Sequence, residues 1–284
     1  MEWIMKTVFL VCGFIAIAFV LLITVYLIIS GLPAIREVGL TDFLFGTRWA
    51  STDKTDPAYG ILPLSSPLSM APPGPSSSGA HRLPHRRLSL QGGAPKVAAV
   101  IRPAVDLLAG IPSVVYGLVG MMVLLPAIRK TFDIAAGDSL LAAIIVLAVM
   151  ILPSIISVSE TALNAVPREY EEASLALGAT ELETYFRVSV PAAKSGIAAA
   201  VVLGVGRAIG EAMAILMVAG NVANMPSLLS SVKFLTTAIA SEMSYAAVGS
   251  LQRNALYSIG LILFLFIMCI NVILNVFLKR NKEG

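Results

Sequence analysis

Charged residues are scarce in this 284-residue sequence, which holds 13% Asp, Glu, Lys and Arg against 57% hydrophobic residues. A soluble domain carries roughly 25% charged residues, so this scarcity indicates that lipid is the solvent. It also excludes disorder over the whole chain, which needs low hydrophobicity and high net charge. The formal net charge is only +3. That is too small for the basic face of a nucleic-acid-binding protein, so we expect no nucleic acid partner.

Cysteine and histidine are almost absent as well. Cys12 and Cys269 both lie in apolar runs, which excludes a disulfide framework and a zinc site. His81 and His85 are the only histidines, which leaves few candidates for histidine-based catalysis. The phosphate-loop pattern G-x-x-x-x-G-K-S/T does not occur, so we do not expect the chain itself to hydrolyse ATP. These absences predict a protein that is not an enzyme, with no catalytic residue, metal or cofactor.

Long apolar runs are what the sequence has instead. A helix needs about 20 apolar residues to cross a bilayer core roughly 30 Å thick. The runs that meet this requirement are residues 7–30, 107–128, 139–159, 196–221 and 254–278. The first run is longer than the roughly 7–15 residues of a signal-peptide core, so we expect it to be retained. The predicted fold class is an all-α membrane protein, a polytopic helical bundle, with residues 1–284 as a single transmembrane domain.

Residues 65–93 do not fit this pattern. The segment is rich in proline and serine, contains both histidines, and has no Ile, Val, aromatic or acidic residue. Its three basic residues, Arg82, Arg86 and Arg87, account for the whole net charge of +3. Five spans would put the two termini on opposite sides of the membrane. Both termini are basic, however, and the positive-inside rule therefore favours an even number of spans. A sixth span is expected, and the segment lies where it should be.

The most polar stretch between spans is residues 166–191, which we call the coupling loop. Pro167 is placed to begin a short helix and Gly178 to end it. Thr180 and Glu183 have the spacing of a capping box that begins a second helix. We expect the apolar side chains of that second helix, Leu182, Tyr185 and Phe186, to face away from the membrane. Such a helix–glycine–helix unit is either a docking surface or an amphipathic connector on lipid headgroups.

The coupling loop resembles the EAA loop of ABC-importer permeases. Glu172, Ala173 and Ser174 are followed by three residues, Gly178, nine residues and then Val188–Pro191, which reproduces the spacing of the family pattern. Ser174 stands where the family has alanine, and Val188 and Val190 replace Ile and Leu. The resemblance implies a type I importer permease of six spans, whose loop docks on the ATPase subunits through Glu172, Ala173, Gly178 and Pro191.

An arginine and a glutamate interrupt the apolar run 196–221. Arg207 and Glu211 are one helical turn apart, so a continuous helix would place them on one face. Ionisable residues at bilayer depth cost about 2.5–3.5 kcal/mol and mark a pathway by default. The alternative is an internal ion pair that only neutralises itself. Gly206 and Gly210 are expected to form a close helix-packing face around this pair.

Several blocks resemble the phosphate-specific ABC permeases, and more closely their PstC-type than their PstA-type subunit. These blocks are Tyr59–Pro63, Leu108–Gly117, Leu203–Asn221 and Leu235–Met243. By this resemblance, Arg207, Glu211 and Ser113 line the substrate pathway. Pro112 and Ser113 break the run 107–128, where exposed amide groups could meet an anion. A simple proline kink is the alternative, and Arg102 and Asp106 are expected to form an i,i+4 pair at the membrane surface.

The anomalous segment 65–93 has two explanations. PstC-type proteins have a membrane helix at this position, and the codons for His-Arg read one base later encode Ile or Thr followed by Val, Ala, Asp or Gly. A pair of compensating frameshifts is therefore one hypothesis, and a genuine Pro/Ser-rich insertion is the other. An intact reading frame with no apolar alternative in the coding DNA would exclude the first. If the segment is real, we expect poor assembly.

The function expected from these residues is ATP-driven import of inorganic phosphate across the bacterial cytoplasmic (inner) membrane, with this chain as a multi-pass permease. The partners implied by the resemblance are a PstA-type permease subunit, an ATPase subunit dimer, an extracytoplasmic phosphate-binding protein, phosphate and membrane lipid. One alternative is a permease for another oxyanion, molybdate or sulfate. Another is an ATP-independent anion transporter or channel that uses Arg207 and Glu211.

Overall fold

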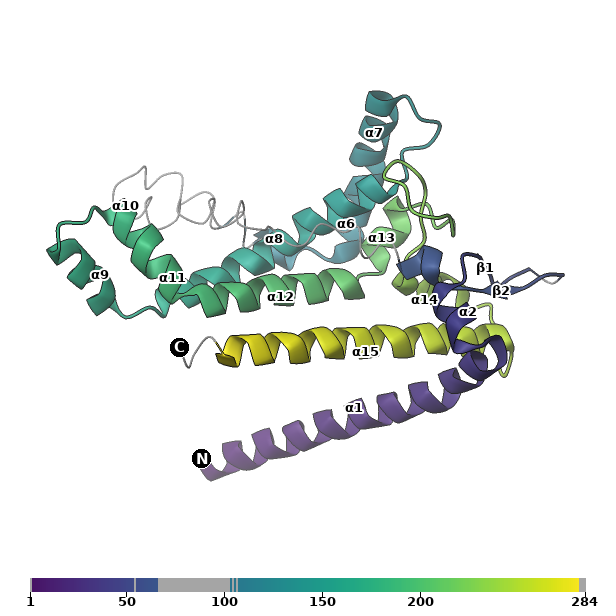
Figure 1. Cartoon of the computed structure of the whole chain (residues 1–284), viewed down its shortest axis with the longest axis horizontal. Coiled ribbons are helices and arrows are strands. Elements are labelled where there is room, and N and C mark those ends of the chain that lie inside the picture. The colour runs from purple at the N-terminus through teal and green to yellow at the C-terminus, as the bar shows by residue number, and fades with distance from the viewer. Residues whose placement is uncertain (1, 54, 66–102, 104, 106, 281–284) are drawn as a thin grey trace.

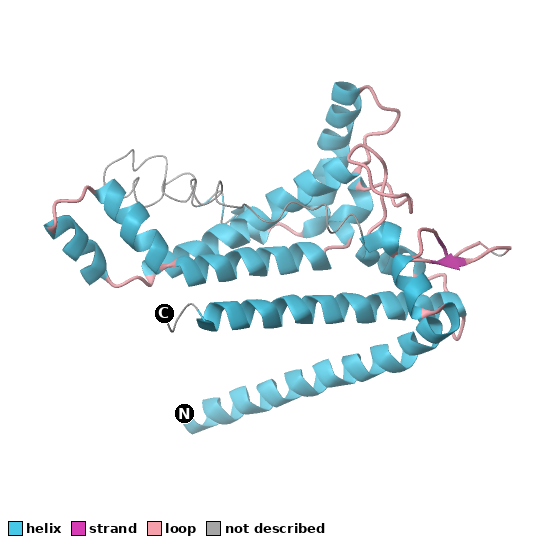
Figure 2. Ribbon diagram, in the orientation of Figure 1, coloured by secondary structure: helices cyan, strands magenta, loops and turns pink. Residues whose placement is uncertain are grey.

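The computed structural model describes residues 2–53, 55–65, 103, 105 and 107–280. The described part is almost wholly helical, as predicted, and its strands are β1 (Trp49–Ala50) and β2 (Ala58–Tyr59), which pair antiparallel as one hairpin. Figure 2 shows how helices dominate the molecule. The expected pair of Arg102 and Asp106 lies outside the described residues, and so does the anomalous segment 65–93 apart from Ser65.

Two long helices form one side of the molecule. Helix α1 (Glu2–Val38) and helix α15 (Leu251–Arg280) contain the expected spans 7–30 and 254–278, and they run antiparallel beside each other (Figure 1). They meet closely at Gly31, where an added Cβ would lie 3.0 Å from the Ser258 Cα. The Ser258 hydroxyl donates to the Gly31 carbonyl at 2.6 Å. The start of α1 and the end of α15 therefore lie at the same end of the molecule.

A second group of helices packs around α8 (Leu140–Asn164), which contains the expected span 139–159. The segments against it are α6 (Ser113–Val119), the π-helical turn η2 (Gly120–Leu124), α7 (Leu125–Phe132), α12 (Lys194–Gly210) and α13 (Met213–Val218). Their shared core includes Leu140, Val146, Met150, Ala214 and Ile215, all nearly inaccessible to solvent. The Ser139 side chain begins α8 by accepting a hydrogen bond from the Ala142 amide at 3.3 Å.

The glycines of α12 contact α8 at positions other than those expected. A Cβ at Gly196 would overlap the Ala162 side chain, and one at Gly204 would lie 2.6 Å from Ile155 Cγ1. No atom of the described chain lies within 4 Å of a Cβ added at Gly206 or Gly210. Among the described residues, the predicted close packing face at Gly206 and Gly210 is therefore not found. The glycines of α12 that pack closely against α8 are instead Gly196 and Gly204, which lie earlier in the helix.

The run 196–221 is not one continuous helix. Helix α12 ends at Gly210, and Glu211 has the extended backbone angles φ −72° and ψ 132° before α13 begins. The Thr236 hydroxyl donates to the Glu211 carbonyl at 2.7 Å, so this carbonyl is satisfied outside any helix. The expectation of an unbroken span here is corrected: α12 is 17 residues long, about 25 Å, and α13 turns away against α6.

The two ends of the molecule carry different elements. At one end, which we call the loop end, lie α9 (Arg168–Ala176), α10 (Glu181–Thr184), the π-helical turn η3 (Tyr185–Ser189) and α11 (Val190–Ala192) (Figure 1). At the other, the hairpin end, lie α2 (Leu40–Phe45), the β1–β2 hairpin and α14 (Leu235–Glu242). The start of α1 and the end of α15 belong to the loop end.

Two glycines bring the backbone together at the base of the hairpin. A Cβ added to Gly46 would lie 2.8 Å from the Gly60 Cα, and a Cβ added to Gly60 would overlap the Gly46 backbone. The Leu62 amide donates to the Gly46 carbonyl at 3.2 Å, and the Gly60 amide to the Arg48 carbonyl at 2.9 Å. This close approach fixes the hairpin against α2 and the residues that follow β2.

Candidate functional site

The coupling loop has the helix–glycine–helix form that its sequence predicts. Helix α9 ends at Ala176 with Leu177 as its C-cap, and Gly178 follows with φ +86°, a left-handed conformation that glycine adopts without strain. The Thr180 side chain accepts from the Glu183 amide, and the Glu183 carboxylate accepts from the Thr180 amide at 3.1 Å, so the capping box is confirmed. The hydrogen bonds that the Glu183 carboxylate accepts, first from the Thr180 amide and then from the Thr180 hydroxyl, hold the pKa of Glu183 below its usual range.

Polar contacts between the two halves make the coupling loop one unit. The Ser174 and Thr184 hydroxyls are 2.8 Å apart and hydrogen-bonded, which joins α9 to α10. The Ser189 hydroxyl donates to Glu171 Oε1 at 2.7 Å, which joins α9 to η3. Ser174 is the residue that departs from the alanine of the EAA pattern. In this chain its hydroxyl therefore contributes a hydrogen bond that alanine could not make.

The outer surface of the coupling loop is exposed, with one exception to the predicted pattern. The residues expected to contact an ATPase are all accessible: Glu172, Ala173, Gly178 and Pro191. Leu177 is 89% exposed, although it is apolar. Leu182 and Phe186 are exposed as predicted, but Tyr185 is only 4% exposed. The prediction for Tyr185 is wrong because its ring packs inward, in one apolar cluster with Leu163 at the end of α8.

Arg207 and Glu211 do not share a helix face. The exposed Arg207 is hydrogen-bonded through Nη1 to the Ser154 hydroxyl of α8 at 3.4 Å. Glu211 turns the other way, and its Oε1 accepts from the Ala214 amide at 3.0 Å, at the start of α13. Among the described residues no ion pair joins them, because α12 ends before Glu211 could complete the turn. In the part of the chain that the structure describes, the guanidinium therefore has a neutral partner and no charged one.

Ser113 begins α6 directly after an interruption of the helix, as the sequence predicts. Residues 107–110 are helical, Ile111 and Pro112 are not, and the Val115 amide donates to the Pro112 carbonyl at 3.0 Å. The Tyr116 hydroxyl spans the break by donating to the Leu108 carbonyl at 2.6 Å. Within the described residues, no hydrogen bond joins Ser113 to Arg207 or Glu211.

The structure nevertheless brings the helices of both breaks together. A Cβ at Gly117 would lie 3.0 Å from the Ala214 Cα, so α6 and α13 pack with their backbones in near contact. Each of these helices begins directly after two non-helical residues, α6 at Ser113 and α13 at Met213. Ser113 and Glu211 therefore lie on neighbouring segments, whereas Arg207 is positioned by α12 and α8.

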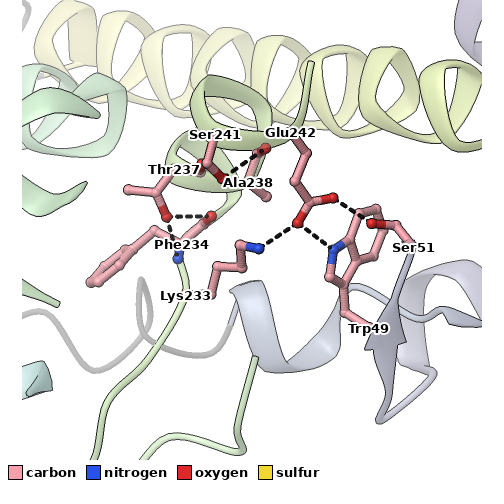
Figure 3. A network of polar contacts seen from close by, with 8 residues as sticks. All are labelled: Trp49, Ser51, Lys233, Phe234, Thr237, Ala238, Ser241 and Glu242. Atoms are coloured by element: carbon pink, nitrogen blue, oxygen red, sulfur yellow. Dashed lines mark hydrogen bonds and ion pairs between the residues drawn. The ribbon is translucent and has the colours of Figure 1, made fainter. Parts of the chain in front are cut away.

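Sequence reasoning missed a buried polar cluster at the hairpin end. The Glu242 carboxylate, at the end of α14, accepts from the Trp49 indole N–H at 3.1 Å and also from the Ser51 hydroxyl. Lys233 forms an ion pair with the same carboxylate (Figure 3). The signal was available: a glutamate in the apolar run Leu235–Met243, with a lysine just before it, is expensive in a membrane protein.

The sequence and the fold are both similar to those of known transport proteins. The family model described as "Binding-protein-dependent transport system inner membrane component" matches residues 93–283. The "Probable ABC transporter permease protein YqgH" of Bacillus subtilis is 40% identical over 276 residues, 91% of this chain and 86% of that protein. The "Phosphate transport system permease protein PstC" of Xylella fastidiosa (strain Temecula1) is 30% identical over 300 residues, 95% of this chain and 90% of that protein.

A further relative and a solved structure agree with these matches. The PstC protein of Pasteurella multocida is 34% identical over 203 residues, which covers 64% of this chain and 63% of that protein. A chain from a solved structure of the MetNI methionine ABC transporter, in an inward-facing conformation, has a TM-score of 0.52. It is 19% identical, and the match covers 89% of this chain and 93% of that chain. The likeness to that structure is one of fold.

Proposed function

The chain belongs to the family of binding-protein-dependent ABC transporter permeases of the bacterial inner membrane, and we propose that the substrate it carries is inorganic phosphate. As a multi-pass permease of this family it has no catalytic activity of its own, and ATPase subunits and a binding protein act with it. The finer proposal is that these partners are an ATPase dimer, a PstA-type second permease and a phosphate-binding protein. Relatives that are named as phosphate permeases support it.

One observation carries the proposal of an anion substrate. Among the described residues, the Arg207 guanidinium has no carboxylate partner, and it is hydrogen-bonded to the Ser154 hydroxyl. A guanidinium offers five donors in a planar fork that suits phosphate oxygens. A positive charge within a membrane-spanning helix is costly unless it faces water or a partner. We propose that a phosphate ion in transit is that partner.

The same proposal gives the coupling loop its role. Its exposed residues Glu172, Ala173, Gly178 and Pro191 form the surface that docks on the ATPase. The contacts from α9 to α10 and η3 let the loop move as one body when the ATPase closes. With this loop on the cytoplasmic side, the start of α1 and the end of α15 are cytoplasmic too, and the hairpin end is extracytoplasmic.

The experiment is ATP-driven uptake into proteoliposomes that hold the complete transporter and its binding protein. We expect radioactive phosphate to accumulate, and a tenfold excess of unlabelled molybdate or sulfate to leave this accumulation unchanged. Arg207→Ala should abolish uptake while the ATPase subunits still co-purify, and Ser154→Ala, the matched control, should retain most of it. Competition by molybdate or sulfate would assign another oxyanion. Anion flux without ATPase subunits would favour a channel, and full uptake by Arg207→Ala would remove the proposed role of Arg207.

A further inference from the structure

The cluster around Glu242 joins two segments that are far apart in the sequence. Trp49 and Ser51 come from the hairpin, Lys233 lies just before α14, and Glu242 is the last residue of α14 (Figure 3). Glu242 is 7% exposed and the Lys233 side chain 13% exposed, so the ion pair is largely removed from solvent. The carboxylate has three donors and one balancing positive charge. Such a fully partnered buried carboxylate holds its neighbours in one arrangement, and removal of a single partner is costly.

The other end of α14 contacts the break between α12 and α13. The Thr236 hydroxyl donates to the Glu211 carbonyl at 2.7 Å. The neighbouring Thr237 hydroxyl accepts from the Phe234 amide at 3.0 Å and holds the first turn of α14 (Figure 3). The helix is eight residues long, about 12 Å, and its buried side is packed in the apolar cluster of the hairpin end. We therefore expect α14 to move as one rigid unit, so that a displacement at Glu242 also displaces Thr236.

The backbone conformation of Glu211 depends on the position of α14. It is the residue at which α12 stops, and its carbonyl is turned toward Thr236 instead of continuing the helix. Its carboxylate is directed to the Ala214 amide at the start of α13, and Arg207 lies one turn before it on α12. A shift of α14 would therefore release the Glu211 peptide and change the direction in which both side chains project.

We infer that Glu242 is a positioning residue for the anion pathway: its carboxylate fixes α14 to the hairpin, and α14 holds the Glu211 peptide through Thr236. The inference rests on the proposed function in one respect, that Arg207 and Glu211 line the path of the anion. Glu242 does not touch the anion. It links the extracytoplasmic hairpin to the interior of the membrane domain, about two helical turns away.

The test uses variants at both ends of α14 in the complete reconstituted transporter. Glu242→Gln removes the charge and keeps the shape, and Thr236→Val removes the hydroxyl at the other end. Ser241→Ala is the matched control, because the Ser241 hydroxyl donates only within α14, to the Thr237 carbonyl at 2.7 Å and the Ala238 carbonyl at 3.5 Å. The measurements are the yield of assembled complex, the basal ATPase rate, and phosphate uptake against the concentration of phosphate-loaded binding protein.

We expect Glu242→Gln to lower the maximal uptake rate by roughly 10- to 100-fold, as for the loss of a hydrogen bond to a charged group. Thr236→Val should lower it by roughly 2- to 10-fold, as for the loss of a neutral hydrogen bond. Basal ATPase rate and half-saturating binding-protein concentration should not change, and Ser241→Ala should behave as wild type. The double variant should be no slower than the slower single variant, because the same linkage is interrupted twice. Additive losses, or an uptake rate that only follows the yield of complex, would overturn the inference.

If Glu242→Gln fails to assemble, the pair Lys233→Met with Glu242→Gln replaces it. This pair removes both charges, so no unpaired ion remains buried, and we expect assembly to recover while uptake stays low. Recovery of uptake with assembly would count against a positioning role. Failure of the proposed function can be told apart from failure of this inference. Full uptake by Arg207→Ala refutes the anion pathway. Full uptake by Glu242→Gln, when Arg207→Ala is inactive, refutes only the role of Glu242.

Discussion

Replacing Gly178 distinguishes the shape of the coupling loop from the surface that it presents. Its φ of +86° is strained for an L-residue, and a left-handed conformation costs a residue such as alanine about 1–2 kcal/mol. No atom of the described chain lies within 4 Å of an added Cβ, so the chain itself gives no steric penalty. Asparagine adopts the left-handed region far more readily than alanine but is larger. Gly178→Ala is therefore the strained small variant, and Gly178→Asn the less strained large one.

The two explanations, backbone shape and docking surface, predict opposite rankings of these two variants by uptake rate. If only the backbone matters, Gly178→Ala loses about 5- to 30-fold in the fraction of correctly shaped loops, and Gly178→Asn loses less. If the loop fills a groove on the ATPase, the larger side chain collides there and Gly178→Asn is the slower variant. We expect the second order, because the space over Gly178 is open in this chain while Leu177 beside it is 89% exposed.

The assay is ATP-driven uptake together with the ATPase rate, measured on complexes purified in equal amount. Uncoupling is seen as ATP hydrolysis that continues while phosphate accumulation falls, and it should be most complete for Gly178→Trp. Membrane insertion is the control and should be the same in every variant. Uptake by Gly178→Trp at the wild-type rate would refute docking through this surface. Faster uptake by Gly178→Asn than by Gly178→Ala would show that backbone shape alone matters.

Three further predictions concern the packing and polar contacts of single residues. Because hydrogen bonds lower the pKa of Glu183, the cap that its carboxylate forms is complete above the usual glutamate range and is lost as the pH falls through the lowered pKa. Intrinsic amide exchange itself slows on acidification, so the measurement is the protection factor of the α10 amides. This protection factor should fall at low pH, and fall less in Glu183→Gln, which keeps a capping oxygen. Gly117→Ala should destabilise the solubilised protein by about 1–3 kcal/mol through overpacking against the α13 backbone. Gly206→Ala, the control, should not destabilise it. Thermal unfolding of the two variants measures the difference. Ser174→Ala should lower the local stability of the coupling loop by about 0.5–1.5 kcal/mol, because the hydrogen bond to Thr184 is lost. We expect faster amide exchange in α9 and an unchanged uptake rate. A slower uptake rate would indicate that this hydrogen bond also serves coupling.

Local sequence signals predicted the coupling loop well. The end of α9 at Gly178 and the capping box of α10 depend on residues within a few positions of each other, so spacing alone specifies them. The break at Ile111 and Pro112 was predictable for the same reason, because proline cannot continue a helix. These features need no knowledge of how distant segments pack.

Features that depend on distant segments could not be predicted in this way. The break at Glu211 follows no proline, and its carbonyl is satisfied by Thr236, 25 residues later. The direction in which Tyr185 points is decided by packing against the end of α8. The partners of Glu242 lie as far as 193 residues away, in a hairpin of two-residue strands that hydrophobic periodicity does not reveal. In each case a tertiary contact overrides the local pattern.

The backbone contact between Gly46 and Gly60 limits how this chain can vary. At most interior positions a larger residue can be accommodated when a neighbour becomes smaller, so two substitutions together restore the volume. Here a Cβ on Gly60 would overlap the Gly46 backbone, and a Cβ on Gly46 would overlap the Asp42 carbonyl and lie 2.8 Å from the Gly60 Cα. Neither glycine can become smaller to make room. No second substitution at the partner position can therefore rescue a first one. A genetic screen for suppressors of Gly60→Ala should recover changes elsewhere, in α2 or in the residues after β2, and none at Gly46.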